Sequence, residues 1–216
     1  MKQEAKLVLE LAELEKEKLN YQVELKRMRE EENSKYCGKA MTQFPIIKDQ
    51  YLVLSLLGKG GYSEVYKAYD LENCREVAVK IHHFDDNWSD SLKANYIKHA
   101  LRENETHKDL NHPRIVSQFD TVEIDNNSFC TILELCSGPD LYMYLKLHKQ
   151  VPEKEAKLIV SQILSGLKYL NDRQSKIIHF DLKPQNILFH KGEIKLSDFG
   201  LCKRVEENKE IIELTS

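Results

Sequence analysis

The spacing of the apolar residues changes near residue 136, and this change limits the folds that the chain can adopt. Before that point, apolar residues fall in short runs that turn residues separate, which predicts strands. The runs cover 52–57, 64–69, 75–81, 115–119 and 129–135, and the breaker-free segment 88–110 is expected to be helical. After Ser137-Gly138-Pro139 the spacing is helical, and 153–170 carries a broad apolar stripe behind Pro152. Strands followed by helices predict an α+β fold with two lobes.

Residues 2–32 follow a different pattern and contain neither Gly nor Pro. Side chains recur there in steps of four and three, with one lysine among apolar residues. The series is Leu7, Leu11, Leu14, Lys18, Tyr21, Leu25 and Met28. A period of 3.5 residues predicts a coiled-coil helix over 1–34, which a partner helix covers. The alternative is a single helix that lies against its own domain. Residues 35–50 break the period and are expected to be a linker before a domain that begins at 51.

The composition excludes several classes of protein. Of the 216 residues, 41% are hydrophobic and 31% are charged, with a formal net charge of -3. This balance gives no electrostatic reason to expect nucleic-acid or membrane binding. No apolar run approaches the roughly 20 residues that span a bilayer, and the charged N-terminus is unlike a signal peptide. The five cysteines form no CxxC pair, which predicts reduced thiols in an intracellular protein.

A glycine cluster joins the first two predicted strands. It reads Gly58-Lys59-Gly60-Gly61-Tyr62-Ser63, and an alternating run follows it. In dinucleotide-binding folds such glycines open a helix, whereas here they are expected to close a hairpin. Glycines at 58 and 60 let the backbone approach a polyphosphate without interference from Cβ atoms. Taken alone, the cluster is explained equally well as a plain tight hairpin.

Four further segments carry polar side chains of the kind that a phosphate-binding loop needs beside it. Lys80 ends the apolar run Val77-Ala78-Val79, and Glu103 lies on the predicted helix ten residues before Pro113. Glu105 is the rival to Glu103, since residues two apart turn to nearly opposite faces of a helix. The other two segments are His179-Phe180-Asp181-Leu182-Lys183-Pro184-Gln185-Asn186 and Ser197-Asp198-Phe199-Gly200.

In this order and at this spacing, the segments resemble the eukaryotic protein kinases. The resemblance implies that Asp181 orients the substrate hydroxyl and accepts its proton, and that Lys183 contacts the transferred phosphate. It implies that Asn186 and Asp198 hold two Mg²⁺ ions, which bridge the phosphate oxygens of ATP. A lysine at the position of Lys183 is also typical of the serine/threonine class, so the resemblance implies that class.

The same resemblance implies the surroundings of the nucleotide. Glu103 is expected to pair with Lys80 and to hold it against the α- and β-phosphates. The residues expected to contact ATP are Leu57, Gly58, Gly60, Gly61, Val65, Ala78, Lys80, Glu103 and Leu188. Phe180 stands where these kinases usually have an arginine that binds a phosphate on the activation loop, so activation by that phosphate is less expected here.

Within this group the details resemble the Tousled-like kinases. The residues that carry this resemblance are 56–68, 77–82, 112–116, 128–131, 153–156, 167–171 and 177–180. Gln185 departs from an expected glycine and Phe180 from an expected tyrosine. The resemblance implies a nuclear enzyme, with the cytoplasm as a second location, that phosphorylates histone chaperones in chromatin assembly. It also implies pairing of two chains through the coiled coil.

The distance from Gly200 to Ser216 is short for this family, whose fold continues with further helices. We therefore expect a bilobal kinase fold with a complete N-lobe and a C-lobe truncated after the metal-binding motif. Two functions stay open. The chain is an active serine/threonine kinase, or it is a catalytically incompetent fragment that pairs with the full-length enzyme through its coiled coil.

Overall fold

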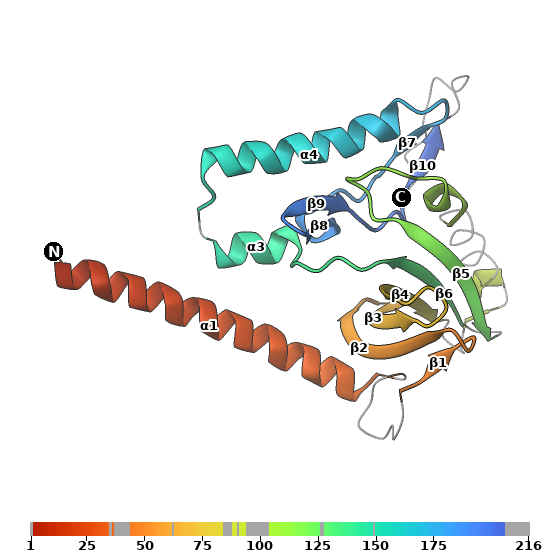
Figure 1. Cartoon of the computed structure of the whole chain (residues 1–216), viewed down its shortest axis with the longest axis horizontal. Coiled ribbons are helices and arrows are strands. Elements are labelled where there is room, and N and C mark those ends of the chain that lie inside the picture. Colours follow the sequence, from red (N-terminus) through yellow and green to blue (C-terminus); the bar gives the residue numbers. More distant parts are fainter. Residues whose placement is uncertain are drawn as a thin grey trace. The chain divides into compact units, whose positions relative to one another are not determined.

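The computed structural model describes residues 2–34, 36, 44–61, 63–83, 88–89, 91–93, 104–125, 128–148 and 150–205 (Figure 1). The chain forms two compact units, Met1–His82 and His83–Ser216. The division therefore does not fall near residue 136, where the apolar spacing changes, because the last two predicted strands group with the helices. In the described part of the chain, we find no helix long and apolar enough to cross a membrane.

The first unit begins with α1 (Lys2–Glu32), a helix of 31 residues. Its end is capped by Asn33, whose side-chain amide donates to the carbonyl of Arg29 at 2.9 Å. Five side chains of the predicted seam have exposed fractions between 50% and 65%: Leu7, Leu11, Leu14, Tyr21 and Met28. The predicted helix is therefore present, and its pairing with a second helix stays a prediction.

Four antiparallel strands follow in the first unit, and each pairs with the next one along the chain. They are β1 (Ile46–Ile47), β2 (Tyr51–Lys59), β3 (Ser63–Asp70) and β4 (Arg75–His83). Burial alternates strictly along β3, so one face of the hairpin is covered. β1 lies within the segment 35–50 that was expected to be a linker, and it pairs with the start of β2.

The second unit contains the hairpin of β5 (Gln118–Asp125) and β6 (Ser128–Glu134). The predicted strand 115–119 is displaced, because β5 begins only at Gln118. Ile115 instead makes a single parallel bridge to Leu196. The backbone N–H of Leu196 donates to Arg114 at 2.8 Å, and its carbonyl accepts from Val116 at 2.9 Å. Of the predicted helix 88–110, residues 91–93 and 104–108 are helical; 90 and 94–103 lie outside the described residues.

The remaining elements of the second unit are mostly short. They are α3 (Leu141–Leu147), α4 (Glu153–Asn171), β7 (Lys176–Ile178), the 3-10 turn η1 (Pro184–Asn186), β8 (Ile187–His190), β9 (Glu193–Leu196) and β10 (Lys203–Val205). Pro152 is the N-cap of α4 rather than part of its first turn. β8 and β9 form a tight hairpin, and β10 pairs with β7.

A hydrophobic core joins these elements and positions the segment that follows β9. Leu196 and Phe199 are fully buried in it, together with Ile115, Leu170 and Ile194. Gly166 of α4 lies so close to this core that a Cβ atom there would stand 2.8 Å from Leu196 Cδ1. The end of β9 therefore packs directly on the long helix, which places the segment after β9 beside the loop between β7 and η1.

Candidate active site

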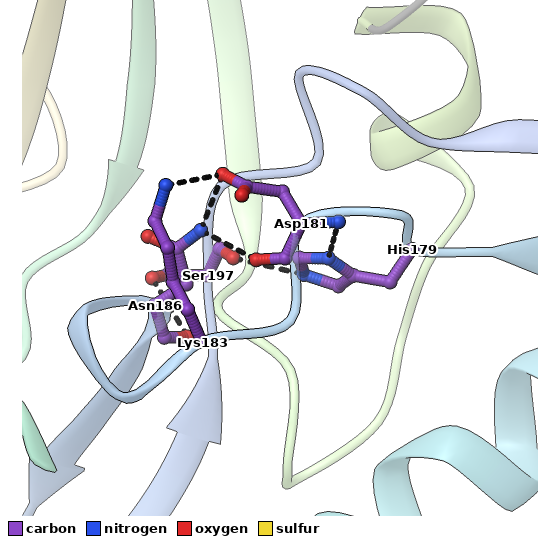
Figure 2. A network of polar contacts seen from close by, with 5 residues as sticks. All are labelled: His179, Asp181, Lys183, Asn186 and Ser197. Carbon is purple, nitrogen blue, oxygen red and sulfur yellow. Dashed lines mark hydrogen bonds and ion pairs between the residues drawn. The ribbon is translucent and has the colours of Figure 1, made fainter.

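The loop from β7 to η1 presents Asp181 with its carboxylate already held (Figure 2). Asp181 Oδ2 accepts hydrogen bonds from Lys183 Nζ at 2.7 Å and from Asn186 Nδ2 at 2.9 Å. Pro184 begins η1, and its fixed φ suits the first position of such a turn. The turn brings Asn186 back over the loop. Both hydrogen bonds use Oδ2, so Oδ1 is the carboxylate oxygen that can accept from a substrate hydroxyl.

Asn186 is the residue that locks this loop. Its side-chain amide also donates to the backbone carbonyl of Asp181 at 2.8 Å, and its own N–H donates to the carbonyl of Lys183 at 2.9 Å. Only 6% of the residue is exposed. Because the NH₂ group makes both side-chain bonds, the amide oxygen Oδ1 points away from Asp181. Amide and carboxylate oxygens are the ligands that Mg²⁺ prefers.

His179 joins the loop to the end of β9. Its Nε2 lies 3.0 Å from the carbonyl of Ser197, and its Nδ1 lies 3.3 Å from the backbone N–H of Asp181. Nδ1 must then accept, so the proton is on Nε2, which donates to Ser197. Burial lowers the pKa of His179, and the bond to Ser197 and the nearby carboxylates oppose this only in part. The neutral ring therefore fits both of its partners.

Ser197 makes the second link between the loop and β9. Its N–H and its hydroxyl both donate to the carbonyl of Asn186, at 2.9 Å and 3.1 Å. Asp198 is the next residue, so the two predicted metal ligands, Asn186 and Asp198, come from segments that are bonded to each other. The structure thus brings Asp181, Asn186 and the Asp198 backbone into one site. No cluster of three or more His, Cys, Asp or Glu suited to a metal occurs among the described residues.

Two residues of the site have positive φ angles that side chains rarely adopt. Phe180 has φ 60°, and the N–H of Asp181 reaches back over it to the carbonyl of His179 at 2.9 Å. Asp198 has φ 59°. Such conformations cost about 1–3 kcal/mol each and persist only where their surroundings impose them. One of them directly precedes Asp181 and the other is Asp198 itself, so both strained positions lie at the predicted functional aspartates.

Packing fixes the segment that follows Asp198. The ring of Phe199 lies against two imidazoles, with centroid distances of 4.6 Å to His107 and 4.8 Å to His179. Further on, Lys203 Nζ lies 5.4 Å from the centroid of the Phe180 ring. These contacts indicate that His179 and Phe199 act as packing residues of the loop. His107 and Lys203 were not predicted, because neither belongs to a recognisable motif.

Arg204 ties the same segment to the helical residues 104–108. Its guanidinium donates to the carboxylate of Asp109 at 2.9 Å, the carbonyl of Glu105 at 3.0 Å and the hydroxyl of Thr106 at 3.3 Å. Glu103, the predicted partner of Lys80, lies outside the described residues, so that pairing stays a prediction. Glu105, its rival, is exposed at this position.

The glycine cluster closes a hairpin between β2 and β3, as predicted. The N–H of Gly60 donates to the carbonyl of Ser63 at 2.7 Å. Gly58 stands opposite Val65, and Val65 stands opposite Lys80 on β4. Cross-strand neighbours share a face, so this row sets Lys80 on the face of the hairpin that carries Val65.

The space around the glycines suits a ligand. A Cβ atom added at Gly58 or Gly61 would meet no protein atom within 4 Å. Protein packing therefore does not demand glycine there, whereas close approach of a phosphate group would. The other predicted ATP contacts of this unit are Leu57, exposed on β2, and Ala78, buried on β4. Leu188 belongs to β8 in the second unit.

The comparisons with known proteins agree with this chemistry. Residues 51–216 match the family model described as "Protein kinase domain". Serine/threonine-protein kinase tousled-like 2 of Xenopus tropicalis is 50% identical over 211 residues, which are 96% of this chain and 30% of that protein. Serine/threonine-protein kinase tousled-like 1 of Caenorhabditis elegans is 48% identical over 223 residues, which are 100% of this chain and 23% of that protein.

A plant relative shows the same similarity. Serine/threonine-protein kinase TOUSLED of Arabidopsis thaliana is 50% identical over 196 residues, which are 89% of this chain and 28% of that protein. The chain thus spans between 23% and 30% of the length of these curated relatives. The family match covers the glycine hairpin, the Asp181 loop and the Asp198 segment together. The chain therefore belongs to the protein kinase family, and within that family it is similar to the Tousled-like serine/threonine kinases.

Proposed function

We propose that this chain transfers the γ-phosphate of ATP to serine or threonine hydroxyls of a protein substrate. The observation that carries the proposal is the Asp181 carboxylate, which Lys183 and Asn186 hold through Oδ2 alone. A carboxylate fixed in this way orients a hydroxyl at Oδ1 and accepts its proton as the phosphorus–oxygen bond forms.

The neighbouring side chains have separate tasks in this proposal. Lys183 is half exposed beside Asp181, so it can contact the transferred phosphoryl group while it stays bonded to the base. The hydrogen bond to Asp181 raises the pKa of Lys183, so this side chain stays cationic at neutral pH. Lys80, Gly58, Gly60 and Gly61 would bind the polyphosphate.

Magnesium fits the residues that are present. Asn186 offers an amide oxygen directed away from Asp181, and Asp198 offers a carboxylate on the adjoining segment. These two residues would hold the metal. When bound, Mg²⁺ supplies charge neutralisation for the phosphate oxygens. The residues of the chain itself position the hydroxyl and take up its proton.

The test is transfer of labelled γ-phosphate from MgATP to a serine- and threonine-containing substrate protein. The purified chain is expected to label the substrate, and Asp181→Asn is expected to lower the rate roughly 10²–10⁴-fold, as for loss of a general base. Asp172→Asn is the matched control, because the Asp172 side chain forms an exposed ion pair with Lys168 at the end of α4. Equal labelling by Asp181→Asn and the wild type would contradict the assignment of the base.

For the substrate and the location, the proposal follows the resemblance to the Tousled-like kinases. We propose histone chaperones of the anti-silencing type as substrates, a role in chromatin assembly and a nuclear location, with the cytoplasm as a second location. Such a chaperone should then be labelled in the assay above at least about tenfold faster than a generic basic protein, as tenfold corresponds to about 1.4 kcal/mol of preference. Equal rates would contradict this choice of substrate.

The second part of the proposal concerns α1. Its exposed seam at heptad spacing supports pairing with the helix of a second chain, either identical or full-length. A second candidate function rests on this seam: the chain transfers no phosphate and acts only by pairing with a full-length kinase. Sedimentation of the wild type and of Leu11→Glu, together with the labelling assay, separates the two. Pairing without labelling favours the second function, and labelling that Asp181→Asn abolishes excludes it.

A further inference from the structure

A chain of buried polar contacts leads from the end of α1 to the glycine hairpin within the first unit. It begins at Ser34, two residues after the helix ends, whose hydroxyl lies 2.7 Å from the hydroxyl of Tyr66 on β3. The Tyr66 hydroxyl donates to Glu64 Oε2. Glu64 Oε1 in turn lies 2.6 Å from Lys59 Nζ, and Lys59 is flanked by Gly58 and Gly60.

The donors in this series of hydrogen bonds follow from the single hydroxyl proton of Tyr66. Tyr66 has one hydroxyl proton and gives it to Glu64, so Ser34 must donate to the Tyr66 oxygen. The Ser34 oxygen in turn accepts the backbone N–H of Tyr36 at 3.2 Å. Each of these hydroxyl groups therefore donates its proton toward the Glu64 carboxylate. Consecutive hydrogen bonds of this kind polarise and strengthen one another.

Because these groups are buried, loss of any one of their hydrogen bonds should cost free energy of folding. Tyr66 is fully buried, and Glu64 and Ser34 are 5% and 7% exposed. A buried carboxylate needs partners that replace its water, and a buried polar group left without one costs free energy. Lys59 is the partner with a half-exposed side chain. The position of Lys59 is thus coupled to buried side chains of β3.

Two further contacts attach the end of α1 to the same strands. Glu31 Oε1 accepts the backbone N–H of Leu56 on β2 at 3.3 Å, and the Tyr36 ring packs edge-on against Tyr66 at a centroid distance of 5.8 Å. Figure 1 shows the last turns of α1 beside β2, in agreement with the contacts between them. Covering a strand edge in this way satisfies donors that would otherwise face solvent.

We propose that the end of α1 is a positioning element for the glycine hairpin: Ser34 fixes Lys59, through Tyr66 and Glu64, and thereby sets the affinity for the ATP phosphates. The consequence for ATP rests on the function proposed above, whereas the coupling itself does not. Ser34 is a positioning residue, because it acts through Tyr66 and Glu64 and touches no substrate.

Amide hydrogen exchange tests the coupling directly. The N–H of Gly60, which closes the hairpin on Ser63, is expected to exchange about tenfold faster in Ser34→Ala and in Tyr66→Phe, since each loses one bond to a charged chain. Ser34→Thr keeps the hydroxyl and should exchange like the wild type. Amides of the β8–β9 hairpin in the second unit should not change in any variant, which shows that the effect is local.

Asn33→Ala is the matched control for damage to the helix end. It removes the cap on Arg29 and leaves the Ser34 chain intact, so Gly60 should exchange at the wild-type rate. Equal exchange of Gly60 in Ser34→Ala and Asn33→Ala would overturn the proposal. The MgATP dissociation constant should rise several-fold in Ser34→Ala and in Tyr66→Phe, and not in Asn33→Ala. If the wild type binds no MgATP, the proposed kinase function fails, and the exchange of Gly60 still decides the coupling.

Discussion

The Asp181 loop and the glycine hairpin are held in opposite ways. The Asp181 loop is fixed by its own side chains, since Asn186 and Lys183 both bond Asp181 within five residues of sequence. The glycine hairpin is closed by a backbone bond from Gly60 to Ser63, and its lysine pairs with Glu64, whose further partners end at Ser34, distant in sequence. The loop that positions the proposed proton acceptor is thus held by hydrogen bonds between side chains close in sequence. A loop that must admit a nucleotide depends on distant support.

The largest effect is expected from the residue that locks the Asp181 loop. Asn186→Ala removes both bonds to Asp181 and one proposed metal ligand, so the rate of phosphate transfer should fall at least about a hundredfold. Labelling kinetics measure this loss. Gln162→Ala, which removes a bond to the backbone of Ile194 on β9 without touching the loop, should change the rate far less. A similar loss in both variants would mean that the fold, rather than the loop, is affected.

Two glycines should respond differently to alanine. A Cβ atom at Gly138 would stand 2.7 Å from Phe189 Cβ and 2.9 Å from the Phe189 carbonyl, so Gly138→Ala should lower the free energy of unfolding by about 1–3 kcal/mol. Gly61→Ala meets no protein atom and should stay within about 0.5 kcal/mol of the wild type. Denaturant titration measures both. A destabilised Gly61→Ala variant would show that protein packing, and not a ligand, requires that glycine.

The Asp181 loop should weaken in acid because His179 must stay neutral. Burial lowers the pKa of His179 in the folded state, so its contribution to stability is complete above the unfolded pKa of about 6.5. That contribution is lost as the pH falls from there through the folded-state pKa. Between pH 7 and pH 5, the free energy of unfolding should fall less steeply in His179→Gln than in the wild type. Burial also lowers the pKa of His112, so part of the slope remains. Identical slopes would contradict the role of His179.

The smallest expected effect concerns the contact between Lys203 and Phe180. A partly exposed cation–π contact contributes about 0.5–1 kcal/mol, so Lys203→Ala should speed amide exchange in the β7–β10 pair by roughly two- to fivefold. Lys157→Ala removes an exposed lysine from α4, away from the β7–β10 pair, and should leave that exchange unchanged. Exchange that is the same in both variants would show that the contact does not stabilise β10.

The sequence was most informative where local pattern decides the structure. The glycine hairpin, α4 and the Asp181 loop follow from turn residues, helical spacing and motif order, and all three are present. The structure adds to or departs from the sequence-based expectation where residues distant in sequence form the contacts. β1 forms in the expected linker because β2 offers Ile46 and Ile47 an edge. Ile115 leaves the predicted strand because Leu196, 81 residues away in sequence, bonds its neighbours. Ser34 gave no signal at all, since its partner Tyr66 lies 32 residues further along the chain.

One measurement tests the division of labour between the two loops most directly. Single-turnover phosphate transfer and the MgATP dissociation constant should be measured together for Asp181→Asn and Gly61→Ala. We predict that Asp181→Asn loses at least about a hundredfold in rate and keeps the wild-type affinity, because the base acts only in the chemical step. Gly61→Ala should bind MgATP several-fold more weakly and keep most of the rate at saturation. If Asp181→Asn transfers phosphate at the wild-type rate, this loop is not the catalytic one and the account is wrong.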